Sequence, residues 1–439
     1  MKSVPLLALA LLGAAVAARA DDWPMLGGRP DRNMVSPEKN LPIDWHPGGK
    51  APRKNVKWSA PLGHVTFGSP VIAAGRVFIG TDSDDPDLNK KSGILKCFSE
   101  RDGSLLWKAV HEKLPNAGED DGTVGICCTP CVVGDRVYYV SNRAELVCRA
   151  VSDGKVQWSL DLRATLGISP NQASASSPLV VDDLVFVVTG QGTDYKTGKI
   201  KNPAAPSFVA VDRHTGKVAW QDASPGNKIL TGQWGSPAYG VVEGQPQIAF
   251  PGGDGWLYSF EPKTGKLLWK FNAKAHEKPS ASGEPETTFN LVAAPVFSGD
   301  RILFAIGEPE AGSGPGALRA VDARKRGDIT KTGELWRLGG NDFNDSISTV
   351  ALHGGLVFAA DTAGFLSCLD ADTGNRLWSH DVKANVWGSP LVSIFAATRE
   401  KKLLATVTTL PEVAHGTPVA ANGTLYIVGQ KTLYALEAK

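Results

Sequence analysis

The sequence carries almost no net charge, because its 46 basic residues are balanced by 45 acidic ones. That balance gives no electrostatic reason to expect nucleic acid or an anionic membrane as a partner. Beyond residue 20 no apolar run is long enough to cross a bilayer, so no transmembrane segment is predicted. Motifs of common enzymes are also missing: the chain has no GxSxG, no HExxH, no haem-binding CxxCH and no EF-hand spacing.

Residues 1–20 have the features of an export signal. Lys2 precedes an apolar stretch, and the sequence ARA at 18–20 is a small-x-small cleavage site before Asp21. The mature chain is therefore expected to be exported, either to the periplasm or out of the cell. The residue directly after the cleavage site is not Cys, so no lipid attachment is expected there. Residues 21–53 are rich in Pro, Gly and charge, and they predict an extended leader that lies across the main body.

One sequence element recurs along the rest of the chain. AVDRHTGKVAW at 210–220 combines an apolar run, an acidic turn, a Gly and a Trp four residues after the Gly. Related copies end at Trp107, Trp158, Trp269, Trp336 and Trp378. Each copy follows a small-Ser/Thr-Pro-Val opening and an apolar hairpin, which predicts four short strands. Such units cannot cover both faces alone, so they predict an all-β propeller in which each Trp packs against the next blade.

The repeats predict eight blades, of which the seventh is truncated. In that repeat the opening at 387–392 runs directly into 393–407, so the central hairpin is missing. The eighth copy, at 416–436, has three strands and no final Trp. Residues 54–62 have the pattern of the absent fourth strand, and an N-terminal strand that completes the last blade removes an open edge from the ring. The propeller is therefore expected to span 54–439.

The six cysteines fall into two groups. Three of them occupy a strand position where other repeats carry Ala or Ser, and they are expected to pack as small apolar side chains: Cys97, Cys148 and Cys368. The other three lie together at 127, 128 and 131. The CxxC spacing of Cys128 and Cys131 has no second pair, so it gives weak support to zinc or redox chemistry.

An acidic loop, TDSDDPD, contains Asp82, Asp84, Asp85 and Asp87. Carboxylates of this kind suit calcium, but the loop lacks the ordered ligand spacing of an EF-hand. A solvated surface loop is therefore the expected state, with calcium binding as the alternative.

The element from Ala210 to Trp220, together with the small-Ser-Pro-Val strand openings, resembles the pyrroloquinoline-quinone-like (PQQ-like) repeat. The resemblance covers residues 54–439. Its superfamily includes quinoprotein alcohol dehydrogenases and the non-enzymatic outer-membrane assembly lipoproteins of Gram-negative bacteria. The resemblance therefore implies a propeller fold and leaves the function open.

The dehydrogenase relatives hold the quinone between a Trp and a disulfide of two adjacent cysteines. Carried to this chain, that arrangement implies Cys127 and Cys128 for the disulfide. Trp234 and Trp387 are the stacking candidates, because both open their repeats in the register of Cys127. Cys128, however, occupies a column that holds Gly or Ser in other repeats, so it is also interpreted as a small packing residue.

The same resemblance implies a calcium ion held by a Glu and an Asn, and an Asp that acts as base. Glu145 and Gln191 are the metal candidates, although Gln191 stands where the enzymes have Asn and is longer. Asp254 is the candidate base, although Gly-Asp-Gly is also an ordinary hairpin turn.

The favoured interpretation is an exported, non-catalytic propeller that binds a protein or a small ligand at its face and acts as a scaffold in the cell envelope. No cofactor is expected in that case. The alternative is a periplasmic PQQ-dependent dehydrogenase that oxidises alcohols or sugars with PQQ and calcium.

Overall fold

A computed structural model describes residues 22–48, 52–87, 91–113, 124–171, 174–194, 196–275, 290–307, 315–384, 386, 391–408 and 412–438. The predicted export signal at 1–20 lies outside these residues and stays a prediction. Among the described residues, no helix is long and apolar enough to cross a membrane.

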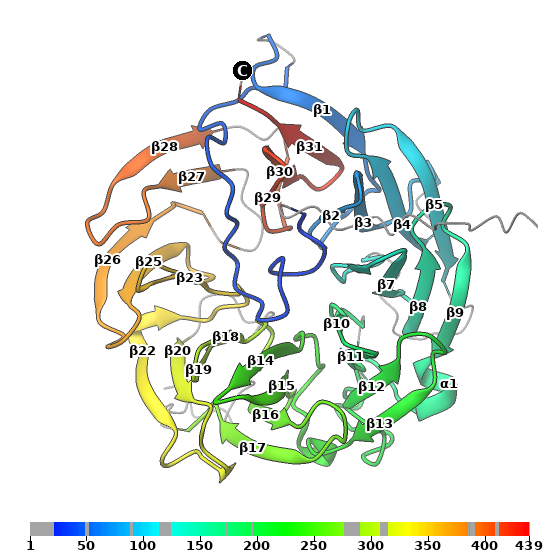
Figure 1. The fold of residues 1–439 in the computed structure, drawn as a ribbon, viewed down its shortest axis with the longest axis vertical. Coiled ribbons are helices and arrows are strands. Elements are labelled where there is room, and N and C mark those ends of the chain that lie inside the picture. The colour runs from blue at the N-terminus through cyan, green and yellow to red at the C-terminus, as the bar shows by residue number, and fades with distance from the viewer. Residues whose placement is uncertain are drawn as a thin grey trace, which may run out of the picture.

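Seven antiparallel sheets of four strands each, one of them extended by a fifth strand, stand around a ring as the blades of a propeller (Figure 1). Blade one contains β2 (Val71–Ala73), β3 (Arg76–Asp82), β4 (Ser92–Ser99) and β5 (Leu105–Glu112). Blade two contains β6 (Cys131–Val133), β7 (Arg136–Val140), β8 (Glu145–Ala150) and β9 (Val156–Asp161), followed by helix α1 (Leu162–Leu166). Blade three contains β10 (Leu179–Val181), β11 (Leu184–Val188), β12 (Phe208–Asp212) and β13 (Val218–Asp222), followed by the 3-10 turn Gly226–Lys228.

The second half of the ring repeats this order. Blade four contains β14 (Ala238–Val242), β15 (Gln245–Pro251), β16 (Trp256–Phe260) and β17 (Leu267–Asn272). Blade five contains β18 (Val296–Ser298), β19 (Arg301–Ile306), β20 (Pro315–Asp322) and β22 (Glu334–Asn344). Blade six contains β23 (Ala351–His353), β24 (Leu356–Ala360), β25 (Phe365–Asp370) and β26 (Arg376–Asp381). The closing blade contains β29 (Val419–Ala421), β30 (Thr424–Val428), β31 (Thr432–Leu436) and β1 (Val56–Pro61), which pairs antiparallel with β31.

The prediction of eight blades is wrong, because the described residues of the seventh repeat do not form a four-stranded blade. Its described residues form a sheet of two strands, β27 (Leu391–Phe395) and β28 (Leu403–Thr408). The shortening that the sequence indicated is therefore seen in this part of the chain. The ring has seven complete blades, with the two-stranded sheet between blade six and the closing blade.

The predicted packing of the repeated Trp is confirmed at five blade junctions. Each Trp ring lies against the turn glycine of the next blade, at the pairs Trp58/Gly103, Trp107/Gly154, Trp158/Gly216, Trp220/Gly265 and Trp336/Gly374. The indole N–H of each Trp also donates to a backbone carbonyl beside that turn, at 2.7–3.1 Å. The glycines have φ between 70° and 73° and leave no room for a Cβ, so the Trp and the Gly of the motif form one interlocking contact.

Trp269 departs from this pattern because of the insertion in the next repeat. Its indole N–H donates to Gln247 Oε1 within its own blade, at 2.8 Å, and its side chain is fully buried. The insertion forms β21 (Gly327–Asp328), which pairs in parallel with the outer edge of β17. Blade four therefore has a fifth strand that comes from blade five.

The leader crosses the centre of the ring, as Figure 1 shows in dark blue. In six of the seven blades it forms hydrogen bonds with the innermost strand two residues after the Pro position of the repeat. Its partners at that position are Ile72, Val132, Tyr239, Phe297, Leu352 and Ala420. In its described part the leader satisfies backbone groups that face the channel.

Near the end of the leader, Trp45 packs beside the truncated repeat. Its side chain is buried with Ile427, Tyr434 and Leu436 of the closing blade, and Ile394 and Ala405 of the two-stranded sheet pack against this cluster. The leader therefore supplies apolar contacts where the seventh repeat lacks its inner hairpin.

Candidate functional site

The two adjacent cysteines do not form the disulfide that the dehydrogenase resemblance implies. The six cysteines are thiols and none is in a disulfide bond. The Cys128 thiol is buried, exchanges hydrogen bonds of 3.3 Å with the backbone N–H and C=O of Val140, and has its pKa raised to about 12 by burial. Cys127 is half-buried and donates to the carbonyl of Val124 at 3.3 Å. The two thiols thus bond to different parts of the chain, Cys127 to Val124 and Cys128 to Val140.

Glu145 belongs to a buried network between blades one and two. Its Oε2 lies 3.1 Å from His111 Nδ1 and accepts from Ser141 Oγ at 3.0 Å. The hydrogen bond from His111 is the main cause that lowers the pKa of Glu145. His111 Nε2 in turn lies 2.7 Å from the hydroxyl of Tyr139, to which Arg149 also donates. Arg143 Nε lies 3.4 Å from Glu145 Oε1. This carboxylate therefore already has several donors, so its surroundings are not those of a metal ligand.

Gln191 and Trp234 lie near each other between blades three and four. The Gln191 side chain is fully buried, accepts from the Ser169 N–H at 2.7 Å and donates to the Asn202 carbonyl at 2.8 Å. Gln233, the residue before Trp234, donates to the Gln191 carbonyl at 2.8 Å. Trp234 is half-buried at the start of blade four. Trp387, the other stacking candidate, lies outside the described residues.

Asp254 is a buried turn residue between β15 and β16. Its Oδ2 accepts from the Tyr258 hydroxyl at 2.6 Å and its Oδ1 from the Trp256 N–H at 3.2 Å. Burial raises the pKa of Asp254, because the charged form has little solvation. Gln233 Oε1 accepts from the N–H of Gly253, so this turn is joined to the Gln191 region. In the structure Asp254 is therefore a residue of the hairpin turn between β15 and β16, as the Gly-Asp-Gly sequence also allowed.

Taken together, the described candidates do not match the donor set that the dehydrogenase resemblance implies for PQQ and calcium. The structure brings Gln191, Trp234 and the Asp254 turn together, while Glu145 has its own partners in blades one and two. In the described part of the chain no group of three or more His, Cys, Asp or Glu side chains is arranged to hold a metal ion.

Arg32 is a residue at the centre of the ring that sequence reasoning missed. Its side chain is 0 % exposed and donates to the carbonyls of Leu26, Ser177, Pro178 and Pro237 at 2.7–3.2 Å. Burial lowers its pKa to about 10, while the nearby Cys131 thiol and Asp31 act in the opposite direction. One guanidinium thus ties the leader to blades three and four. A single Arg in a Gly- and Pro-rich segment has no periodicity that signals this position.

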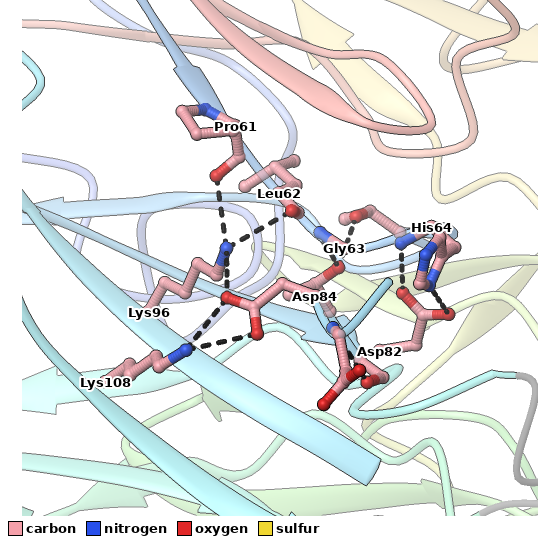
Figure 2. Close-up of polar contacts among 12 residues, drawn as sticks. Pro61, Leu62, Gly63, His64, Asp82, Asp84, Lys96 and Lys108 are labelled. Atoms are coloured by element: carbon pink, nitrogen blue, oxygen red, sulfur yellow. Dashed lines mark hydrogen bonds and ion pairs between the residues drawn. The ribbon is translucent and has the colours of Figure 1, made fainter. Parts of the chain in front are cut away.

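The acidic loop forms a second polar site, at the seam between the closing blade and blade one. Figure 2 shows Asp84 between the ammonium groups of Lys96 and Lys108, at 3.1 and 3.0 Å. Lys96 also donates to the carbonyls of Pro61 and Leu62 at 3.2 Å, immediately after β1. Burial acts to raise the pKa of Asp84, but the hydrogen bonds from the two lysines outweigh it and lower the pKa.

The other described acids of this loop are not arranged as calcium ligands. Asp82 Oδ1 accepts from the N–H groups of His64 and Val65 at 2.6 and 2.9 Å, and its pKa is raised by burial. A cavity of about 560 Å³ adjoins the seam, lined by Asp84, Asp85, Lys91, Lys108, Val110 and Glu112 among others. Asp82 departs from the expected solvated loop because it is buried, whereas Asp84 and Asp87 are exposed. The carboxylates of Asp82 and Asp84 bind donors at the seam rather than forming a calcium loop.

Lys96→Met is expected to lower the free energy of unfolding by about 2 to 3 kcal/mol, since the carbonyls of Pro61 and Leu62 lose a charged donor in a buried place. Lys96 has only 5 % of its side chain exposed, whereas Lys108 has 41 %. Lys108→Met is the matched control and should cost less than about 1 kcal/mol. Equal effects of the two substitutions in denaturant unfolding would contradict a role for Lys96 in the seam.

The chain matches a known family over most of the propeller. Residues 91–327 and 314–394 match the model of the family described as outer membrane protein assembly factor BamB, and the two segments together span more than half of the sequence. The chain belongs to this family. The resemblance to PQQ-like repeats is thereby confirmed.

Members of the wider superfamily include enzymes as well as the BamB family. A stretch of 175 residues is 27 % identical to the dehydrogenase subunit of a quinone alcohol dehydrogenase from Gluconacetobacter polyoxogenes, and it covers 39 % of this chain and 20 % of that protein. A similar subunit from Gluconobacter oxydans is 26 % identical over 186 residues, which are 42 % of this chain and 20 % of that protein. The chain spans about a fifth of the length of the curated relatives it matches.

Two solved propellers share the fold at low identity. BamB from Moraxella catarrhalis has a TM-score of 0.53 at 15 % identity, and the match covers 84 % of this chain and 94 % of that protein. Quinohemoprotein alcohol dehydrogenase from Comamonas testosteroni has a TM-score of 0.56 at 14 % identity, and the match covers 97 % of this chain and 82 % of that protein. At these identities the likeness shows the fold alone, so the BamB family and the dehydrogenases stay separate candidates for function.

Proposed function

We propose that this BamB-family propeller is exported and acts as a protein-binding scaffold in the cell envelope, without quinone chemistry. The proposal rests on one observation: three of the residues proposed to hold the quinone or its metal, or to act as base, already form hydrogen bonds within the protein. Cys128, Gln191 and Asp254 are buried and hydrogen-bonded to their own blades and loops. The family description, an assembly factor of the outer membrane, is in keeping with this proposal.

The centre of the ring supports the same conclusion. The leader crosses the central channel and bonds to the innermost strands of the blades, and the Arg32 side chain is buried there. A site for a partner therefore falls on the outer parts of the blades and their loops, which a rigid propeller holds in fixed positions.

The outer edge of blade one offers such a site. Leu105, Leu106 and Val110 of β5 are 49, 47 and 49 % exposed, and in the described part of the chain no strand pairs with this edge. An open edge offers unpaired backbone N–H and C=O groups to an extended segment. The protein itself shows that an outer edge of this propeller accepts a strand, because β21 pairs with β17. The partner we propose is an extended protein segment with apolar side chains that face Leu106 and Val110.

Cross-linking in a Gram-negative host that carries the full-length protein tests this edge. The double substitution Leu106→Lys and Val110→Lys is expected to reduce the yield of cross-linked envelope proteins at least about tenfold, the factor that corresponds to 1.4 kcal/mol. Val241→Lys is the matched control, because Val241 is 52 % exposed on β14 of blade four. Equal yields from the wild type and the double variant would overturn the proposed edge. The absence of any captured envelope protein would overturn the scaffold itself.

The quinone dehydrogenase is the second candidate, because the curated relatives are dehydrogenase subunits and Trp234 is half-buried beside Gln191. Titration of residues 21–439 with PQQ and calcium, followed by cofactor absorbance and by dye reduction with alcohols and sugars, separates the two candidates. We expect no saturable change and no turnover. Saturable binding with turnover would replace the scaffold by the enzyme.

A further inference from the structure

The hairpin between β29 and β30 turns on Asn422 and Gly423, the one Asn-Gly step in the sequence. Both residues have positive φ, 50° and 70°, as a tight hairpin turn of this type requires. A glycine that follows an asparagine leaves its backbone nitrogen open to the side-chain amide carbon, because it has no Cβ. This turn is therefore the place in the sequence where loss of ammonia through a cyclic imide is sterically easiest.

Three carboxylates hold the two groups that would react. The Asn422 side-chain amide donates to Asp22 Oδ1 at 3.0 Å and to Glu100 Oε1 at 2.9 Å. The Gly423 N–H donates to Glu38 Oε2 at 3.0 Å. Asp22 and Glu38 belong to the leader and Glu100 to blade one, so the contacts made by the two leader acids exist only while the leader is seated. They hold the amide and the attacking nitrogen on separate partners, which both groups must leave before the ring can close.

We propose that Asn422 is a deamidation site that the seated leader protects. In the reaction, the Gly423 nitrogen forms a bond to Cγ of Asn422 and loses its proton, and the bond between Cγ and Nδ2 breaks with release of ammonia. Water then opens the cyclic imide at one of its two carbonyl carbons. The net change is the hydrolysis of a neutral amide to a carboxylate, as aspartate or isoaspartate, with solvent water as the co-reactant.

The product weakens the contacts that delay its formation. Asn422 now bridges Asp22 and Glu100 with two N–H donors, whereas a carboxylate at position 422 has no donor and repels both acids. Burial raises the pKa of Glu100, the hydrogen bond from Asn422 lowers it, and the charge of Asp22 adds to the rise, so this group already lacks good stabilisation. Asp22 also accepts from the Ala74 N–H beside the Trp23–Ile72 bridge, where the described leader begins. Deamidation therefore loosens the start of the leader and cannot be reversed by refolding.

Peptide mass mapping of full-length protein aged at pH 8 tests the protection. Glu38→Ala is expected to deamidate at Asn422 about tenfold faster than the wild type, as loss of one restraining hydrogen bond predicts. Glu400→Ala, an exposed acid on the loop after β27, is the matched control and should keep the wild-type rate. Equal rates in the wild type and Glu38→Ala would overturn the protection. A faster rate in the wild type would overturn it as well, and would indicate that the carboxylates promote the reaction.

Limited trypsin digestion tests the effect on the leader. Arg32 is 0 % exposed, so cleavage after it reports release of the leader. Asn422→Asp, which mimics the product and tolerates positive φ, is expected to be cleaved there about tenfold faster than the wild type, since it loses hydrogen bonds to two charged groups. Asn375→Asp adds the same charge in an exposed turn of blade six and should not change cleavage. Unchanged cleavage of Asn422→Asp would overturn the link between this turn and the leader.

Discussion

Arg32→Ala is expected to lower the free energy of unfolding by about 3 to 5 kcal/mol. The guanidinium is the shared donor to four backbone carbonyls in a place that excludes water, and alanine leaves those carbonyls without it. Arg32→Lys should recover little of the loss, because an ammonium group does not reproduce the planar fork of donors. Denaturant unfolding gives the free energy, and trypsin cleavage within residues 22–48 shows whether the leader is released.

Arg29→Ala is the matched control for Arg32, since both residues lie in the leader. The Arg29 side chain is 57 % exposed and pairs with Asp31 at 3.3 Å, a surface ion pair that should contribute less than about 1 kcal/mol. If Arg32→Ala unfolds like Arg29→Ala and its leader stays protected, the buried guanidinium does not anchor the leader.

The repeated element predicted the blades well because its turn and its two flanking strands are close together in the sequence. The Gly of the acidic turn and the Trp four residues later are fixed by strand and turn geometry, and the Trp then meets the equivalent Gly of the next blade. The same logic explains why Trp269 departs from the pattern. The insertion after Val321 places β21 on blade four, so Trp269 has no glycine turn to meet and bonds to Gln247 instead.

The course of the leader and the arrangement of the candidate site could not be predicted from a local sequence pattern, because they depend on contacts between distant residues. The contacts of Arg32 and Asn33 reach residues far along the sequence, with no period in the leader that reports them. Adjacent Cys127 and Cys128 suggested a disulfide, but the two thiols bond to different backbone carbonyls, those of Val124 and Val140. Blade number failed because the seventh repeat keeps the motif of its opening and loses the hairpin that makes a blade.

Gly103→Ala is expected to lower the free energy of unfolding by about 3 kcal/mol, the sum of a left-handed backbone strain and an overpacked contact. Gly103 has φ of 72°, and a Cβ there would lie 2.7 Å from the ring of Trp58. Trp58 lies on β1, the strand that closes the ring, so the alanine pushes against the seam of the propeller. Denaturant unfolding and hydrogen exchange of β1 measure the effect.

Gly75→Ala isolates the part of this loss that comes from Trp58. Gly75 lies in the same blade with the same φ of 72°, but a Cβ there meets no atom within 4 Å, so alanine should cost only the strain of about 1 to 2 kcal/mol. In a Trp58→Ala background the cost of Gly103→Ala should fall to that of Gly75→Ala, because the ring it displaces is gone. Equal costs of the two glycine substitutions in the wild-type background would mean that the Trp–Gly contact, which recurs at five blade junctions, does not hold the blades together.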